Sequence, residues 1–145
     1  MQNTGDFSWP IRVYYEDTDA GGVVYHSNYL NFMERARTEW LRALGFEQTH
    51  LKDDLGMMIV IHSLNIAFKS PARFNDLLQV HCQFANAGRS SMDIAQTIFR
   101  DGVLLAEASV KAVFVDAASF RPVAIPPAIK DAAMGLTDAA LTKTW

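Results

Sequence analysis

The spacing of hydrophobic residues changes once along the chain, from a helical period to the alternation of strands. Between residues 29 and 44 apolar side chains recur at intervals of three and four, which traces one face of a helix. These positions are Tyr29, Phe32, Met33, Ala36, Trp40, Ala43 and Leu44. The pattern predicts one long amphipathic helix, with Ser27 or Asn28 available to cap its start and Gly45 just past its end.

Four strands are predicted after this helix. A short second helix is expected at residues 48–55, ended by Gly56, and beyond it apolar and polar residues alternate. The predicted strands lie within residues 57–69, 78–84, 92–99 and 106–114. Gly88-Arg89 is expected to turn the chain between the second and third of them, and Asp101-Gly102 is a strong hairpin signal before the last. The later part of the chain therefore predicts a meandering antiparallel sheet.

The order of elements predicts the fold class. Ile11–Tyr15 is rich in β-branched and aromatic residues and predicts a first strand, and residues 16–26 read as a loop. A single helix with one wide apolar stripe must bury it, and the only large partner is the inner face of the sheet. We therefore expect an α+β hotdog fold, in which an antiparallel sheet of about five strands wraps around one long central helix. Residues 1–145 form a single domain, with its core at about 9–127 and a peripheral C-terminal tail at 128–145.

Composition narrows the classes of function. Half of the 145 residues are hydrophobic and the formal net charge is −3, whereas a nucleic-acid binder usually has a strong basic excess. A lone cysteine, Cys82, cannot build an internal disulfide framework. The chain start has no signal-peptide pattern and no apolar run is long enough to span a membrane, so we expect a cytoplasmic protein. His50, His62 and His81 are scattered and make no metal-ligand spacing with Cys82, so no metal is predicted.

The segment from Tyr15 to Tyr29 carries the candidate chemistry. It places acidic residues, two glycines and then a histidine at the mouth of the long helix. The first turn of a helix leaves backbone N–H groups unpaired and electropositive, which suits a developing oxyanion. A carboxylate at the same place suits a base or a nucleophile. From the residue types alone, however, Asp17 and Asp19 equally fit turn-making, and His26 fits a helix-entry residue without chemistry.

The same region resembles a known family. Residues 12–26 (Arg-Val-Tyr-Tyr-Glu-Asp-Thr-Asp-Ala-Gly-Gly-Val-Val-Tyr-His), followed by Asn28-Tyr29-Leu30, closely resemble the signature of the Tol–Pal-associated acyl-CoA thioesterases (YbgC-like). These belong with the 4-hydroxybenzoyl-CoA thioesterases in the hotdog superfamily. Shorter matches occur at Glu34–Glu39, at Pro71-Ala72-Arg73 with Asp76, and at Arg121-Pro122. The resemblance covers roughly residues 9–127.

The resemblance implies roles for individual residues. Asp19 carries the catalytic role, His26 occupies the position of the histidine that accompanies it, and backbone N–H groups near Tyr25 and His26 polarise the thioester carbonyl. Asp17 is expected to support the loop. The 4-hydroxybenzoyl branch often has proline after the catalytic aspartate, whereas this chain has Ala20, which favours the Tol–Pal branch over an aromatic acyl substrate. Whether Asp19 attacks the thioester or activates water stays open.

Coenzyme A is anionic, so basic residues are expected to hold its phosphates. Arg89 with Ser90 and Ser91 is the first candidate, followed by Lys69 and Arg73. No cofactor is expected, because coenzyme A is part of the substrate. We expect a homodimer or homotetramer, since a small sheet leaves edge strands to cover. The resemblance also implies a link to cell-envelope or phospholipid-synthesis proteins.

Two other classes of function remain open. A hotdog acyl-thioester dehydratase or hydratase would use the same substrates without releasing thiol. A non-catalytic acyl-binding or scaffold protein of the Tol–Pal machinery would need no carboxylate beside a helix start.

Overall fold

The helices and strands follow one another in the order that the sequence predicts, and a layer of helices packs on a single sheet. The structure is a computed structural model that describes residues 6–135. The strands are β1 (Asp6–Arg12), β2 (Met57–Phe68), β3 (Leu77–Ala87), β4 (Ser91–Arg100) and β5 (Val103–Asp116). The helices are α1 (His26–Ala43), α2 (Gln48–Leu55) and α3 (Pro127–Ala133), with a 3₁₀ turn at Tyr15–Asp17.

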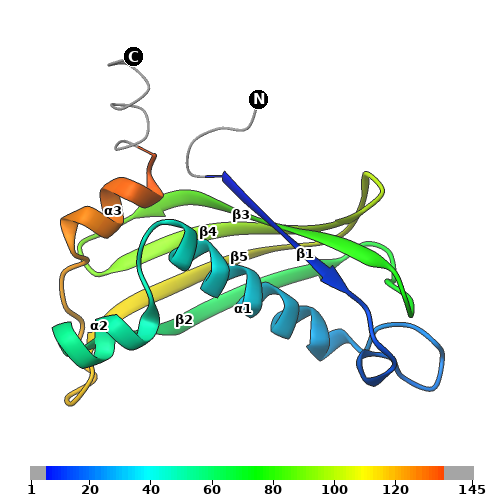
Figure 1. Ribbon diagram of the computed structural model, residues 1–145, viewed down its shortest axis with the longest axis horizontal. Helices are drawn as coiled ribbons and strands as arrows, with labels where there is room; N and C mark the ends of the chain where they lie inside the picture. Colours follow the sequence, from blue (N-terminus) through cyan, green and yellow to red (C-terminus); the bar gives the residue numbers. More distant parts are fainter. Residues whose placement is uncertain (1–5, 136–145) are drawn as a thin grey trace.

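The five strands form one sheet in the order β1-β3-β4-β5-β2, and every neighbouring pair is antiparallel. The long helix α1 lies across one face of this sheet, while α2 and α3 sit at the end where α1 finishes (Figure 1). β1 and β2 are the two edges of the sheet within the described residues. The expected sheet of about five strands around one central helix is confirmed.

The core lies between α1 and the inner face of the sheet. Most of the predicted helical stripe is buried, with Phe32, Met33 and Ala36 fully enclosed, but Ala43 is exposed, and Leu41, which the spacing left out, is buried. The inner face of β5 is lined by Ala106, Val110, Ala112 and Phe114, all buried. Removing these apolar surfaces from water is the main force that holds helix and sheet together.

Sequence signals at turns are confirmed. Asp101 and Gly102 both have positive φ (50° and 80°), the conformation that a tight two-residue hairpin needs. Gly45 follows the end of α1 with φ 99°, and Gly56 ends α2 with φ 65°. Gly88-Arg89 lies in the turn between β3 and β4.

The predicted first strand is wrong in its position. The structure has β1 at Asp6–Arg12 rather than Ile11–Tyr15, and the chain turns away at the 3₁₀ turn. Pro10 lies within β1, opposite Gln79. Proline cannot donate a ladder hydrogen bond, but an edge strand tolerates it where its nitrogen faces away from the sheet.

The predicted cap of the long helix is also wrong. The helix begins at His26, with Tyr25 as the capping residue and no side-chain cap. Instead of capping its own helix, Asn28 donates a side-chain hydrogen bond (3.0 Å) to the carbonyl oxygen of Asp17. The first turn is therefore held by a loop that precedes it.

The C-terminal segment is partly described. The first residues of the expected C-terminal tail form helix α3, and residues 136–145 of that tail lie outside the described residues. Between residues 6 and 135, no helix is long and apolar enough to cross a membrane. In the same range, no three His, Cys, Asp or Glu side chains gather as a metal site would require.

One polar cluster lies inside the core. The side chain of Gln96, on the inner face of β4, donates to the carbonyl oxygen of Met33 (3.0 Å) and contacts the sulfur of Cys82 (3.1 Å). Its own oxygen accepts a hydrogen bond from Arg37 of α1 (2.9 Å). Burial lowers the pKa of Arg37 and raises the pKa of Cys82 to about 12, so the thiol stays protonated and is no nucleophile.

The buried hydroxyl of Tyr29 generates a stability prediction. It accepts a hydrogen bond from the backbone N–H of Ala72 (2.9 Å) and so fastens the segment after β2 to α1. Tyr29→Phe leaves that buried N–H without a partner, and should lower the free energy of unfolding by about 1–3 kcal/mol in urea titration. Tyr14→Phe, at a 60 % exposed tyrosine, should not change it. Equal midpoints for both variants would contradict this role.

Candidate active site

The loop before α1 is organised around Asp17. Its carboxylate accepts a hydrogen bond from the N–H of Tyr14 (2.8 Å). Its carbonyl oxygen accepts two more, from the N–H of Tyr25 (3.0 Å) and from the side chain of Asn28 (3.0 Å). Asp17 is buried and joins the two ends of the loop to the start of the helix. The expected supporting role of Asp17 agrees with these bonds.

Asp19 lies at the tip of the same loop, in a tight turn. Its N–H donates to the carbonyl of Val23 (2.9 Å), and its carbonyl accepts from the N–H of Gly22 (3.0 Å), whose φ is 80°. One carboxylate oxygen accepts from the N–H of Gly21 (2.8 Å). The other has no hydrogen-bond partner among residues 6–135, and the side chain is exposed. Asp19 thus shapes the turn and still presents an oxygen to solvent.

A second segment packs beside this loop. The N–H of Val24 donates to the carbonyl of Ala72 (2.8 Å), and Val23 pairs with Arg73 in an isolated antiparallel bridge. Asp76 holds the segment by accepting from the N–H of Arg73 (2.9 Å) and from the guanidinium of Arg100 (2.8 Å). Burial alone would raise the pKa of Asp76, but these contacts outweigh it and keep the pKa below its usual value. Arg73 therefore lies next to the Asp19 loop.

The start of α1 borders a shallow groove of about 290 Å³. Its lining comes from the helix start and the end of β2: Val24, His26, Tyr29, Phe68, Lys69, Ser70 and Pro71. The ring of His26 lies tilted against that of Tyr25 (4.4 Å between centroids) and meets Phe68 edge-on (6.4 Å). Lys69 pairs with Glu107 (3.5 Å). The structure thus brings His26, Lys69 and Arg73 to the same end of the fold as Asp19.

The backbone N–H groups at the helix start are not all free. The resemblance implies a carbonyl-polarising role for N–H groups near Tyr25 and His26, but the N–H of Tyr25 is already bonded to Asp17. The N–H groups of His26 and Ser27, in the first turn, have no backbone acceptor among the described residues. An unpaired first turn is electropositive and is a site for negative charge. The first-turn N–H groups that are free to meet a negative charge are thus those of His26 and Ser27.

The Arg89 turn lies far from the Asp19 loop in the folded chain. Ser91 pairs with Val113, close to the Met57 end of β2, whereas His26 contacts Phe68 at the other end of that strand. The turn between β3 and β4 is seen beside α3, at the end of the sheet opposite the Asp19 loop (Figure 1). Arg89 is exposed, and its guanidinium contacts the hydroxyl of Ser90 (3.5 Å). Within one chain, Arg89, Ser90 and Ser91 are not brought together with Asp19.

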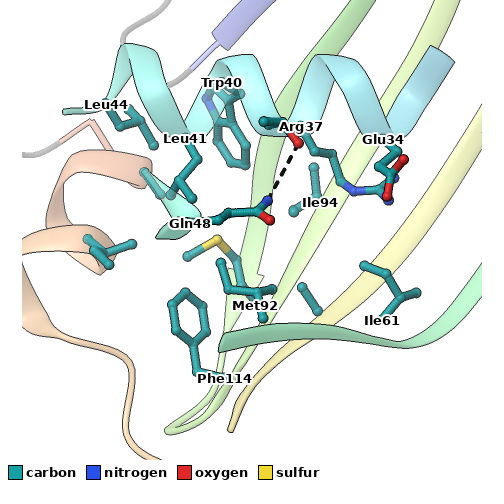
Figure 2. Close-up of a pocket in the computed structure, with 15 residues that line it drawn as sticks. Glu34, Arg37, Trp40, Leu41, Leu44, Gln48, Ile61, Met92, Ile94 and Phe114 are labelled. Atoms are coloured by element: carbon teal, nitrogen blue, oxygen red, sulfur yellow. Dashed lines mark hydrogen bonds between the residues drawn. The ribbon is translucent and has the colours of Figure 1, made fainter. Parts of the chain in front are cut away.

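A second, more enclosed cavity of about 120 Å³ lies between α1 and the sheet and reaches α2 and α3. Leu41 and Leu44 border one end, and Glu34 and Ile61 border the other, which faces the start of α1 (Figure 2). Met92 lies on the sheet side. This cavity was not expected from the sequence, because its walls come from segments far apart in the chain.

Comparison with known proteins identifies the family. A family model described as the thioesterase-like superfamily matches residues 13–133. The chain belongs to this superfamily. It is 44% identical over 126 residues to the Acyl-CoA thioesterase YbgC of Haemophilus influenzae, covering 87% of this chain and 93% of that protein. The Acyl-CoA thioester hydrolase YbgC of Escherichia coli O157:H7 is 42% identical over 128 residues, covering 88% and 95%.

Solved structures agree with this membership of the thioesterase-like superfamily. The crystal structure of a probable thioesterase from Bartonella henselae superimposes with a TM-score of 0.81 at 31% identity, covering 83% of this chain and 99% of that one. The expected hotdog fold and the resemblance to YbgC-like thioesterases are confirmed. The roles of single residues stay predictions.

Proposed function

We propose that the protein hydrolyses the thioester of an acyl-CoA to a free acid and coenzyme A. The observation that carries this proposal is the bond from Tyr25 N–H to the Asp17 carbonyl, with the Thr18–Val24 bridge beside it, which fixes the Asp19 turn to the start of α1. A carboxylate and unpaired helix donors held in one loop-and-helix unit are what thioester hydrolysis needs. Relatives named acyl-CoA thioesterase, at 42–44% identity, support the substrate class.

Two reaction courses fit these groups. In one, a carboxylate oxygen of Asp19 bonds to the thioester carbon, the coenzyme A thiolate leaves, and water cleaves the resulting anhydride. In the other, Asp19 takes a proton from water, whose oxygen adds to the same carbon before the thiolate leaves. In both, the N–H groups of His26 and Ser27 stabilise the oxyanion, and the His26 ring lines the groove. Neither course requires a metal or a cofactor.

The Asp19 assignment is tested by Asp19→Asn, which keeps the oxygen that accepts from Gly21 but removes the charge. Turnover of acyl-CoA, measured by release of free thiol, should fall on the order of 100-fold or more. Asp54→Asn, at an exposed carboxylate of α2, is the matched control and should retain full activity. His26→Ala should lose less, because the backbone donors remain.

Turnover of Asp19→Asn at the wild-type rate would overturn the assignment. A wild-type protein that binds acyl-CoA without releasing thiol would favour the acyl-binding or dehydratase alternatives.

The working unit of this proposal is a homodimer, with two dimers combining into a tetramer. β2 is a twelve-residue edge strand that carries exposed apolar side chains, Ile61 (44 %) and Phe68 (49 %). Exposed edges of this length are usually covered. Antiparallel pairing of two β2 strands would set the Met57 end of one beside the Phe68 end of the other. The partner's Arg89 turn would then lie on the side of this chain's Asp19.

In that dimer, coenzyme A lies across the seam, with Arg89, Ser90 and Ser91 of one copy and Lys69 and Arg73 of the other near its phosphates. Arg89→Ala should raise KM at least several-fold for acyl-CoA, and little for an acyl-thioester of N-acetylcysteamine, which lacks the nucleotide. The reason is that phosphate contacts remote from the carbonyl contribute uniform binding. Equal effects on both substrates would exclude Arg89 as a nucleotide contact.

Shared sites predict complementation between subunits that carry different impaired residues. Mixing Asp19→Asn subunits with Arg89→Ala subunits after exchange should restore activity, because some seams then hold an intact Asp19 and an intact Arg89. The measurement is thiol release at low acyl-CoA against the sum of the unmixed variants, with sedimentation to report the oligomeric state. A fully active monomer at assay concentration would contradict the composite site.

We place this activity in the cytoplasm, as the single reduced, buried Cys82 and the class of substrate suggest. A partner among Tol–Pal or phospholipid-synthesis proteins rests on the family resemblance alone.

A further inference from the structure

The enclosed cavity is large for an unused void. Protein interiors hold few voids larger than a water molecule. At about 120 Å³ it approaches the roughly 150 Å³ of an apolar cavity that binds benzene, so it has room for about four to six carbon atoms. Its lining is mostly apolar, with Met92, Ile94, Phe114 and Ile129 among its residues. Such a space suits a hydrocarbon group better than water.

The cavity lies some distance along α1 from the groove at the helix start, and both are bordered by the same face of the helix. His26, Leu30 and Glu34 are spaced by four residues, so they lie one above another along the helix. Glu34 is eight residues past His26, about 12 Å along the axis at 1.5 Å per residue. Leu30 on this face is 38 % exposed, and on β2 Phe68 and Ile61 are more exposed still. Apolar side chains of α1 and β2 thus lie along the way from the groove to the cavity.

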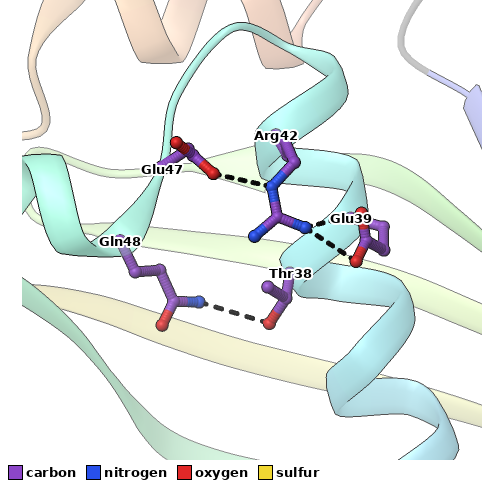
Figure 3. Close-up of polar contacts among 5 residues, drawn as sticks. All are labelled: Thr38, Glu39, Arg42, Glu47 and Gln48. Atoms are coloured by element: carbon purple, nitrogen blue, oxygen red, sulfur yellow. Dashed lines mark hydrogen bonds and ion pairs between the residues drawn. The ribbon is translucent and has the colours of Figure 1, made fainter.

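Helices α2 and α3 close the far end. Arg42 near the end of α1 forms ion pairs with Glu39 (2.7 Å) and with Glu47 before α2 (2.8 Å), as Figure 3 shows. The side chain of Gln48 reaches Thr38 (3.5 Å), and both residues line the cavity. Because α2 is fastened to α1 here, the cavity ends at a wall rather than in open solvent.

We propose that this cavity receives the terminal carbons of a long, unsubstituted acyl chain, and so sets the length of substrate that the enzyme prefers. The proposal rests on the thioesterase function proposed above. A chain needs about nine carbons to cover 12 Å, at roughly 1.3 Å per carbon in a zigzag of 1.5 Å bonds. Adding the four to six carbons that fit the cavity gives about 13 to 15 carbons. A benzoyl ring, joined directly to the thioester carbonyl, is too short to reach it.

Ala112 offers a direct test. It pairs across the sheet with Ile61 on one side and Met92 on the other, and all three line the cavity. Ala112→Leu adds three carbons to the cavity and should lower kcat/KM for acyl-CoA of 14 to 16 carbons at least tenfold. Activity on chains of 6 to 8 carbons should stay within twofold, because these end before the cavity. Ala43→Leu, the same change at an exposed position near the end of α1, should leave the whole chain-length profile unchanged.

A second variant covers the case in which Ala112→Leu does not fold, which thermal unfolding reports. Met92→Ala enlarges the cavity and should shift the preferred chain length upward by about two carbons. A wild-type enzyme that prefers short or benzoyl thioesters, or length profiles that neither variant alters, would overturn the chain-length proposal and leave the thioesterase function intact. A wild-type protein that releases no thiol from any acyl-CoA would instead overturn the function.

Discussion

Burial of the apolar face of α1 is the constraint from which the rest of the structure follows. One helix supplies the inner layer, and five strands curl around it to cover Phe32, Met33 and Ala36. Because α1 runs across the whole face of the sheet, its first turn lies at one end of the sheet, beside the end of β2. The packing that forms the core therefore also leaves the electropositive start of α1 exposed to solvent.

The loops at this end are held by few but well-placed bonds. Asp17 fastens the loop before α1 through its carboxylate and its carbonyl, and Tyr29 fastens the segment after β2 through its hydroxyl. The Asp17 carboxylate and the Tyr29 hydroxyl belong to buried residues and each accepts from a backbone N–H, so each of these two bonds removes an otherwise unpaired donor. Asp19 can remain exposed at the tip of its turn because the bonds of Asp17 and Tyr29 hold the surrounding loops in place.

The sequence was informative where a residue acts locally. The Asp101-Gly102 hairpin, the end of α2 at Gly56 and the buried stripe of α1 as far as Trp40 each depend on neighbours within a few positions, and all are as expected. The start of α1 was not predictable in this way, because Asn28, an expected cap, instead bonds to Asp17 eleven residues earlier. Local preference also argued against Pro10 in a strand, and only the position of β1 at the edge permits it.

Of the site, the sequence predicted the loop and the resemblance predicted the role of Asp19, yet neither distinguished Tyr25 from His26 as the backbone donor. The polar pair of Arg37 and Gln96 left a signal, since Gln96 interrupts the inward apolar positions of β4, but its partner lies 59 residues away. The cavity left no signal in the sequence, because residues of three helices and three strands form its walls together.

The two edges of the sheet differ in a way that bears on assembly. β1 is seven residues long and contains a proline, whereas β2 is twelve residues long. A sheet with two open edges can add copies without limit and grow into a filament. With one edge blunted by Pro10, only β2 would be left to accept a second copy, so pairing through β2 would end in a closed particle rather than an open-ended fibre.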